Sequence, residues 1–206
     1  MTKIIQMQVG GFDNNYSYLI VGKTKDAVLI DPTGSKNVIE RSIRATKSNV
    51  KLVLFTHSHP DHCELAGHFA SKGIKTFFPS KEELGKTIFL DCGEMKVECL
   101  STPGHTLDSV CYLIEKNIFT GDTLFVRGVG TTAYGGNDEL LEKTLAFLSE
   151  LNPSLKLWPG HNYGGEKSTL KEALDNSHIK PNKKTHEIIS KMVEEYNSKH
   201  TTEKKF

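Results

Sequence analysis

The strongest constraint on how this chain can fold is a cluster of histidines and an aspartate placed directly after a short apolar run. Leu52–Phe55 is continuously apolar, which is typical of a strand buried on both faces. Residues 56–62, Thr-His-Ser-His-Pro-Asp-His, follow it at once. An exposed loop has no packing reason to concentrate histidine, so the fold is expected to lead this segment from a buried strand end into a polar cavity.

The spacing of the cluster favours metal binding. Side chains repeat every two residues in an extended segment, so His57 and His59 point the same way. Asp61 and His62 lie in the first turn of a predicted helix, where they can face the same cavity. Imidazole and carboxylate are ligands for first-row metals such as Zn, Fe and Mn. The segment therefore predicts a metal site.

Three further polar residues each follow a glycine at a predicted strand end or loop. They are His105 in residues 102–106, Asp122 in residues 119–125 and His161 in residues 158–163. Glycine lets the backbone approach a site closely, so these three join the candidate metal ligands. The other four of the nine histidines fit no such pattern, and we interpret them as ordinary structural or surface residues: His68, His178, His186 and His200.

Hydrophobic periodicity predicts an α/β fold. Strands are expected over residues 4–9, 16–21, 27–31, 52–55, 76–78, 87–90, 95–101, 110–114, 117–120 and 155–158. Helices are expected over residues 35–47, 61–72, 137–151, 168–174 and 185–197. Strand runs flanked by helices indicate two sheets packed face to face with helices outside, in four layers. Residues 1–178 are expected to form the main domain, with residues 179–206 as a helical tail packed on it or extending it.

Composition narrows the functional class. Lys plus Arg is 26 and Asp plus Glu is 25, a net charge of +1, which counts against a nucleic-acid or membrane-surface protein. The four cysteines contain no C-x-x-C pair, so neither a zinc knuckle nor a thioredoxin-like motif is indicated. Residues 1–10 do not resemble a signal peptide, and no apolar run approaches the ~18 residues of a spanning helix. A cytoplasmic protein with reduced thiols is expected, with its oligomeric state left open.

The combined motifs T-H-x-H-x-D-H, G-H-T, G-D-T-L-F and P-G-H-x-Y resemble the metallo-β-lactamase superfamily over about residues 3–175. Within it the chain is most similar to the glyoxalase II (hydroxyacylglutathione hydrolase) branch and its persulfide dioxygenase relatives. The resemblance implies a four-layer αββα sandwich of two mixed sheets, with metals at one edge of both. Because β-lactamase members typically supply cysteine at the position of Asp122, an antibiotic-degrading role is disfavoured.

The resemblance also implies two divalent metal ions, Zn first and Fe or Mn as alternatives. The implied reaction is hydrolysis of a hydroxyacyl-type thioester, or a related ester, by a metal-bound hydroxide, with catalytic roles for Asp61 and Asp122. Cys63, Cys99 and Cys111 are interpreted as core residues. The implied ligand set places His57, His59 and His105 on the first metal, Asp61, His62 and His161 on the second, and Asp122 between both.

Substrate binding is where the chain departs from the glyoxalase II pattern. Tyr134 and Tyr163 match tyrosines that help hold glutathione, and Arg127 is a candidate source of positive charge. Thr131, however, stands where glyoxalase II has a lysine and persulfide dioxygenases have an arginine. The expected partner is a small-molecule thioester or ester, and the identity of the thiol carrier is left open. No nucleic acid or membrane partner is expected.

Several alternatives stay open. A mononuclear iron persulfide dioxygenase would use His57, His105 and Asp122, a two-histidine, one-carboxylate set. The intact second ligand set favours hydrolysis over oxygenation. A lactonase and a nuclease are further alternatives, and the near-neutral charge counts against the nuclease. Intact ligands also count against a non-catalytic scaffold.

Overall fold

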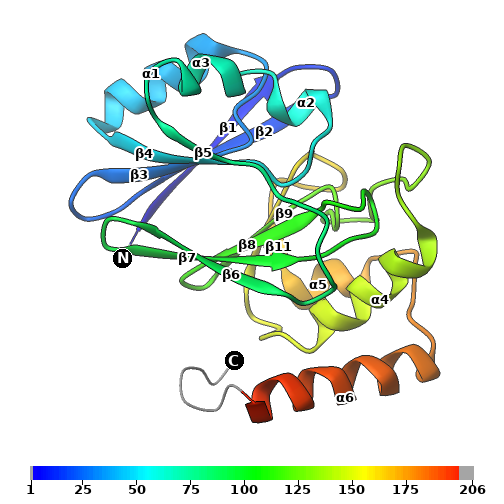
Figure 1. Cartoon of the computed structure of the whole chain (residues 1–206). Helices are drawn as coiled ribbons and strands as arrows, with labels where there is room; N and C mark the ends of the chain where they lie inside the picture. Colours follow the sequence, from blue (N-terminus) through cyan, green and yellow to red (C-terminus); the bar gives the residue numbers. More distant parts are fainter. Residues whose placement is uncertain (1, 200–206) are drawn as a thin grey trace.

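Two mixed β-sheets pack face to face with helices on their outer surfaces, in a computed structural model that describes residues 2–199 (Figure 1). This confirms the predicted four-layer αββα sandwich. Residues 200–206 of the predicted tail, His200 among them, lie outside the described residues. No helix within residues 2–199 is long and apolar enough to cross a membrane.

The first sheet has five strands in the order β1-β2-β3-β4-β5. Its strands are β1 (Lys3–Gly10), β2 (Asn15–Val21), β3 (Asp26–Ile30), β4 (Asn49–Leu54) and β5 (Lys75–Phe77). The pairs β1–β2 and β2–β3 are antiparallel, whereas β3, β4 and β5 run parallel. Parallel neighbours need a crossover, and the helices α1 (Lys36–Thr46), α2 (Pro60–Cys63) and α3 (Ala66–Ala70) supply it.

The second sheet has six strands in the order β11-β10-β9-β8-β7-β6. They are β6 (Thr87–Cys92), β7 (Met95–Ser101), β8 (Val110–Ile114), β9 (Asn117–Gly121), β10 (Lys156–Pro159) and β11 (Ser168–Thr169). Only β9 and β10 pair in parallel, and α4 (Asp138–Ser149) makes the crossover between them. The Asn137 side chain caps this helix, accepting a hydrogen bond from the Leu140 N–H at 2.9 Å.

Apolar contacts fill three layers of core. One lies between the sheets, where residues such as Ile30, Leu54 and Phe119 are fully buried. Ile39 and Phe69 of α1 and α3 cover the outer face of the first sheet. The outer face of the second sheet is covered by α4 and α5 (Leu170–Asp175), and α6 (Lys183–Lys199) packs against α4 (Figure 1).

Two tyrosines tie the facing sheets together at one edge. Tyr112 on β8 donates its hydroxyl hydrogen to the backbone oxygen of Phe55, just after β4, at 2.6 Å. Tyr18 on β2 donates to the backbone oxygen of Pro159 at the end of β10. Both bonds are buried, and each joins the middle of a strand in one sheet to the end of a strand in the other. They fix the separation of the segments that carry the candidate metal ligands.

The predicted continuous helix over residues 61–72 is wrong, because the helix breaks at Glu64 and Leu65. The Leu65 N–H donates to the Pro32 oxygen at 3.1 Å, and the Glu64 carboxylate accepts from the Gly34 N–H at 3.0 Å. These bonds to the turn after β3 replace intrahelical ones, a tertiary effect that local periodicity does not contain. The predicted helix over residues 168–174 likewise begins as strand β11, because Ser168 and Thr169 pair with β10.

Removing the Tyr112 hydroxyl tests the tie between the sheets. Tyr112→Phe leaves the buried Phe55 carbonyl without its donor, so the free energy of unfolding is expected to fall by about 1–3 kcal/mol. Urea unfolding followed by circular dichroism measures it. Tyr134→Phe is the matched control, because that side chain is 75% exposed, and its stability should equal wild type. Wild-type stability of Tyr112→Phe would contradict the role of this bond.

Candidate metal centre

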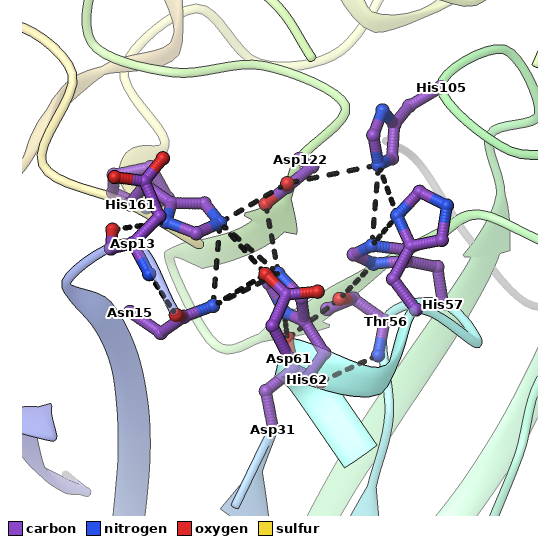
Figure 2. Close-up of polar contacts among 12 residues, drawn as sticks. Asp13, Asn15, Asp31, Thr56, His57, Asp61, His62, His105, Asp122 and His161 are labelled. Atoms are coloured by element: carbon purple, nitrogen blue, oxygen red, sulfur yellow. Dashed lines mark hydrogen bonds and ion pairs between the residues drawn. The ribbon is translucent and has the colours of Figure 1, made fainter. Parts of the chain in front are cut away.

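Every predicted metal-ligand residue lies at one shared edge of the two sheets, after a strand end (Figure 2). The segment after β4 and the start of α2 supply four of them, and the loops after β7, β9 and β10 supply one each. Antiparallel pairing of Asn15 with His161 joins the sheets at this edge. The structure thus brings all seven predicted side chains together: His57, His59, Asp61, His62, His105, Asp122 and His161.

The first group of donors contains His57, His59 and His105. The Nε2 atoms of His57 and His105 are 3.3 Å apart, and each lies 3.1 Å from Nδ1 of His59. A tetrahedral zinc ion with nitrogens at about 2.0–2.1 Å separates two of its ligands by about 3.3 Å. The three nitrogens therefore already have the spacing of ligands around one metal.

The second group contains Asp61, His62 and His161. The Nε2 atoms of the two histidines are 3.3 Å apart, and Oδ2 of Asp61 lies 3.7 Å from each. His62 is fully buried, whereas Asp61 is partly exposed and reaches the cavity described below. This set has the spacing to hold a second ion, in agreement with the division that the resemblance implies.

Asp122 lies between the two groups. Its Oδ1 is 3.3 Å from His62 Nε2, and its Oδ2 is 3.3 Å from His161 Nε2 and 3.7 Å from His105 Nε2 (Figure 2). Oδ1 is buried and accepts no well-directed hydrogen bond from the described residues. A side chain at position 160 would put its Cβ 2.3 Å from this oxygen, so Gly160 leaves the space open. An orphaned buried carboxylate oxygen of this kind fits a bridging metal ligand.

The outward nitrogen of each histidine is already occupied. An imidazole that donates with one nitrogen leaves the other as an unprotonated acceptor. The five inward nitrogens thus converge as acceptors, an arrangement that fits metal cations. The outward contacts join His57 Nδ1 to Thr56 Oγ1 (3.1 Å), His59 Nε2 to Tyr134 O (3.1 Å), His62 Nδ1 to Asp31 Oδ2 (3.0 Å), His105 Nδ1 to Thr131 O (2.7 Å) and His161 Nδ1 to Asp13 O (2.8 Å).

The pKa values of the buried groups at the centre also favour a bound positive charge. Burial favours neutral forms, but the attraction between Asp122 and His62 outweighs it. The pKa of the Asp122 carboxyl is therefore held well below its usual range, and the pKa of His62 is raised well above its usual range. Burial lowers the pKa of His57 well below its usual range, which keeps that ring neutral. The buried carboxylate thus depends on positive charge close to it, which a bound cation would supply.

Asp31 is a functional residue that the sequence analysis missed. Its buried carboxylate accepts from the Thr56 N–H at 2.7 Å, the Thr56 hydroxyl at 2.6 Å and His62 Nδ1 at 3.0 Å. It therefore orients both the start of the histidine cluster and one of its rings. The sequence contained a signal for this residue, because Asp31 directly follows the buried strand β3, as Thr56 and His57 follow its neighbour β4.

Asn15 is a second missed residue. Its side-chain nitrogen donates to Asp61 Oδ2 at 3.1 Å and lies 3.4 Å from the inward nitrogens of His62 and His161. The asparagine is fully buried at the start of β2. Its sequence context reads as an ordinary turn, so only the meeting of the two sheets shows its position.

A cavity of about 1170 Å³ opens onto the centre. His59, Asp61, His105, Asp122 and His161 line it, while His57 and His62 are buried behind them. The candidate substrate residues Arg127, Tyr134 and Tyr163 also lie in its wall. His178 lies there too, so our interpretation of it as unconnected with the site missed its placement.

An αββα sandwich with a histidine–aspartate cluster at the shared sheet edge defines a metal-binding protein class, and comparison with known proteins identifies the family. Residues 10–88 match the model of the metallo-β-lactamase superfamily. The probable polyketide biosynthesis zinc-dependent hydrolase PksB of Bacillus subtilis is 30% identical over 166 residues, covering 73% of this chain and 74% of that protein. The chain belongs to the metallo-β-lactamase superfamily.

Two further comparisons support the branch suggested by the motifs. The probable hydroxyacylglutathione hydrolase glo2 of Schizosaccharomyces pombe is 33% identical over 174 residues, covering 74% of this chain and 66% of that protein. The crystal structure of ETHE1 from Myxococcus xanthus is 25% identical with a TM-score of 0.72, covering 96% of this chain and 91% of that one. The predicted resemblance to this branch is confirmed.

Substitution of Asp31 tests its control of His62. Asparagine suits the positive φ of 47° at this position, but its amide nitrogen cannot accept from His62 Nδ1–H. Asp31→Asn is expected to weaken metal binding by the second group about 10–100-fold, as measured by competition with a chromophoric chelator. Asp91→Asn, an exposed change on β6, is the control. Unchanged affinity of both ions in Asp31→Asn would contradict the role of Asp31.

Proposed function

We propose that this protein is a dinuclear metal-dependent hydrolase that cleaves a small-molecule thioester or a related ester. The observation that carries the proposal is the convergence of five acceptor nitrogens in two groups on either side of the Asp122 carboxylate. Relatives named as a zinc-dependent hydrolase and a hydroxyacylglutathione hydrolase support the reaction class.

His57, His59 and His105 would hold one metal ion, Asp61, His62 and His161 the other, and Asp122 both. Zinc suits this set of imidazoles and carboxylates, with Fe and Mn as alternatives. Bound divalent metals lower the pKa of water to about 7 and polarise a carbonyl oxygen, which supplies a nucleophile and stabilises developing negative charge.

The protein's own groups orient this centre. Three backbone carbonyls, those of Asp13, Thr131 and Tyr134, accept hydrogen bonds from outward histidine nitrogens and fix their tautomers. Asn15 holds Asp61 by a bond to Oδ2. Because Asp61 is partly exposed in the cavity wall, its carboxylate is placed to orient the attacking water and to accept its proton.

A cysteine nucleophile is disfavoured by burial. It raises the pKa of the Cys63, Cys99 and Cys111 thiols to about 12 and that of Cys92 to about 11. A thiol reacts as its thiolate, so these side chains are unreactive at neutral pH. Cys63 is nearest the centre, and its thiol donates to the His57 oxygen at 3.2 Å.

Asp122→Ala tests the bridging position. Loss of the carboxylate removes a ligand from both groups, so metal content per chain is expected to fall at both sites and thioester hydrolysis to be abolished. Elemental analysis of the purified protein and a thiol-release assay on the same sample measure the two effects. Asp91→Ala, an exposed change on β6, serves as the control. An active, fully metallated Asp122→Ala variant would refute the bridging role.

Thiol alkylation tests the absence of a cysteine nucleophile. Iodoacetamide at pH 8 is expected to leave the four cysteines unmodified in the folded protein, because the cysteine thiols stay protonated. The hydrolytic activity should therefore be unchanged. Mass spectrometry counts the modified thiols, and the same treatment in urea should modify all four. Rapid inactivation that parallels modification of Cys63 in the folded protein would point to a thiol-based mechanism.

A mononuclear iron persulfide dioxygenase is the second candidate. His57 and His105 place their Nε2 atoms 3.3 Å apart, and Asp122 Oδ2 is 3.7 Å from His105 Nε2, which is the donor set such an iron would use. Metal analysis with an O₂ electrode separates the candidates. One iron per chain with persulfide-dependent O₂ consumption would favour the dioxygenase, whereas two metals per chain with thiol release would favour the hydrolase.

A further inference from the structure

Aromatic and apolar side chains line most of the cavity beyond the metal-centre residues. Three of them are large side chains left open to solvent, with exposures of 95% for Phe12, 75% for Tyr134 and 40% for Tyr163. Large apolar groups gathered at a cavity mouth commonly mark a ligand surface. Phe125 and Val129 continue this wall inward.

Charge is scarce along the same wall. Outside the metal-centre residues, its permanently charged side chains are Asp13, Glu64 and Arg127. Both acids are engaged within the protein, since Asp13 accepts from the Tyr163 hydroxyl and Glu64 accepts from the Gly34 N–H. Arg127 is therefore the single permanent cation among these lining residues.

Two polar side chains on the wall also form hydrogen bonds within the protein. The Tyr163 hydroxyl donates a hydrogen bond to the Asp13 carboxylate. The Tyr163 ring stacks on the His161 ring, with centroids 5.3 Å apart and an interplanar angle of 18°. Phe125 packs edge-on against the same ring at 4.7 Å. Tyr163 thus offers a ring face. Across the cavity, the Thr131 hydroxyl accepts from the Ala133 N–H at 3.3 Å within its own loop.

Resting on the hydrolase function proposed above, we infer that the substrate is a thioester with a large apolar acyl chain on a thiol arm that lacks carboxylates. A glutathione arm has two carboxylates, and Arg127 alone cannot pair with both. Placing an unpaired carboxylate against an apolar wall is costly. The volume of about 1170 Å³ exceeds the roughly 1,000 Å³ upper range of small-ligand pockets, which leaves room for a long chain.

The reaction balances with water as the only co-reactant. The water oxygen bonds to the acyl carbon, and the carbon–sulfur bond breaks. One water proton leaves on the thiol sulfur, and the other is released as the carboxylic acid ionises. No oxidant or reductant takes part.

Four thioesters distinguish the effect of the acyl group on the rate from the effect of the thiol arm. They are the acetyl and octanoyl esters of N-acetylcysteamine and of glutathione. On the metal-loaded protein, kcat/KM is expected to rise roughly two- to fourfold per added methylene. At equal chain length, the N-acetylcysteamine ester should exceed the glutathione ester about tenfold or more, which corresponds to one unpaired carboxylate. Equal rates for acetyl and octanoyl esters, or a preference for glutathione, would overturn the inference while leaving the hydrolase function intact.

Binding of inert thioethers gives a readout that does not depend on turnover. Isothermal titration calorimetry is expected to show tighter binding of S-octyl-N-acetylcysteamine than of S-octylglutathione to the same metal-loaded protein. If no thioester is hydrolysed by fully metallated protein, the hydrolase function fails. The binding order then still decides the character of the cavity, and the reverse order would overturn it.

Substitutions in the cavity wall test whether the acyl chain binds there. Phe12→Ser and Tyr134→Ser change exposed side chains and are expected to lower the ratio of octanoyl to acetyl kcat/KM about threefold or more each. Ile188→Ser on α6 removes a comparably exposed apolar group, 52% exposed and outside the cavity, and should leave the ratio unchanged. Ratios equal to wild type in both wall variants would contradict acyl binding at this wall.

Discussion

The buried carboxylate of Asp122 is the constraint on which the rest of the structure depends. It lies among histidines from both donor groups, and its Oδ1 accepts no well-directed hydrogen bond within the described chain. A charge held in this way is costly unless a positive charge accompanies it. The converging imidazoles, each fixed by a bond to its outward nitrogen, and the open space beside Gly160 are arranged around that requirement.

The sandwich supplies the rigidity that this arrangement needs. Strand ends of two different sheets meet at one edge, and buried hydrogen bonds from Tyr18 and Tyr112 join them across the core. Asp31, at the end of β3, binds both Thr56 and His62, so it couples the first sheet directly to the centre. Ligand positions are therefore set by packed strands, while part of the cavity wall is built from the loops around Phe12 and Tyr134.

Much of the fold and the centre could be predicted from the sequence because their signals are local. The apolar run before Thr56, the histidine spacing and the glycines before His105, Asp122 and His161 each lie within a few residues. The failures share one cause. The helix over residues 61–72 breaks because Leu65 and Glu64 bond to the distant turn at residues 32–34. Asn15 and His178 were missed for the same reason, since the residues that each lies beside at the site are remote in sequence.

By itself, the sequence determined which residue types are available for chemistry and the strand and helix periodicity that places them at strand ends. These depend on neighbouring residues and backbone geometry alone. Only the tertiary structure decided which oxygen or nitrogen faces which partner. It showed that Tyr163 presents a ring face because its hydroxyl donates to Asp13, and that Arg127 is the only permanent cation among the described residues of the cavity wall. Substrate character follows from such contacts, because recognition depends on groups that folding brings together from separate segments.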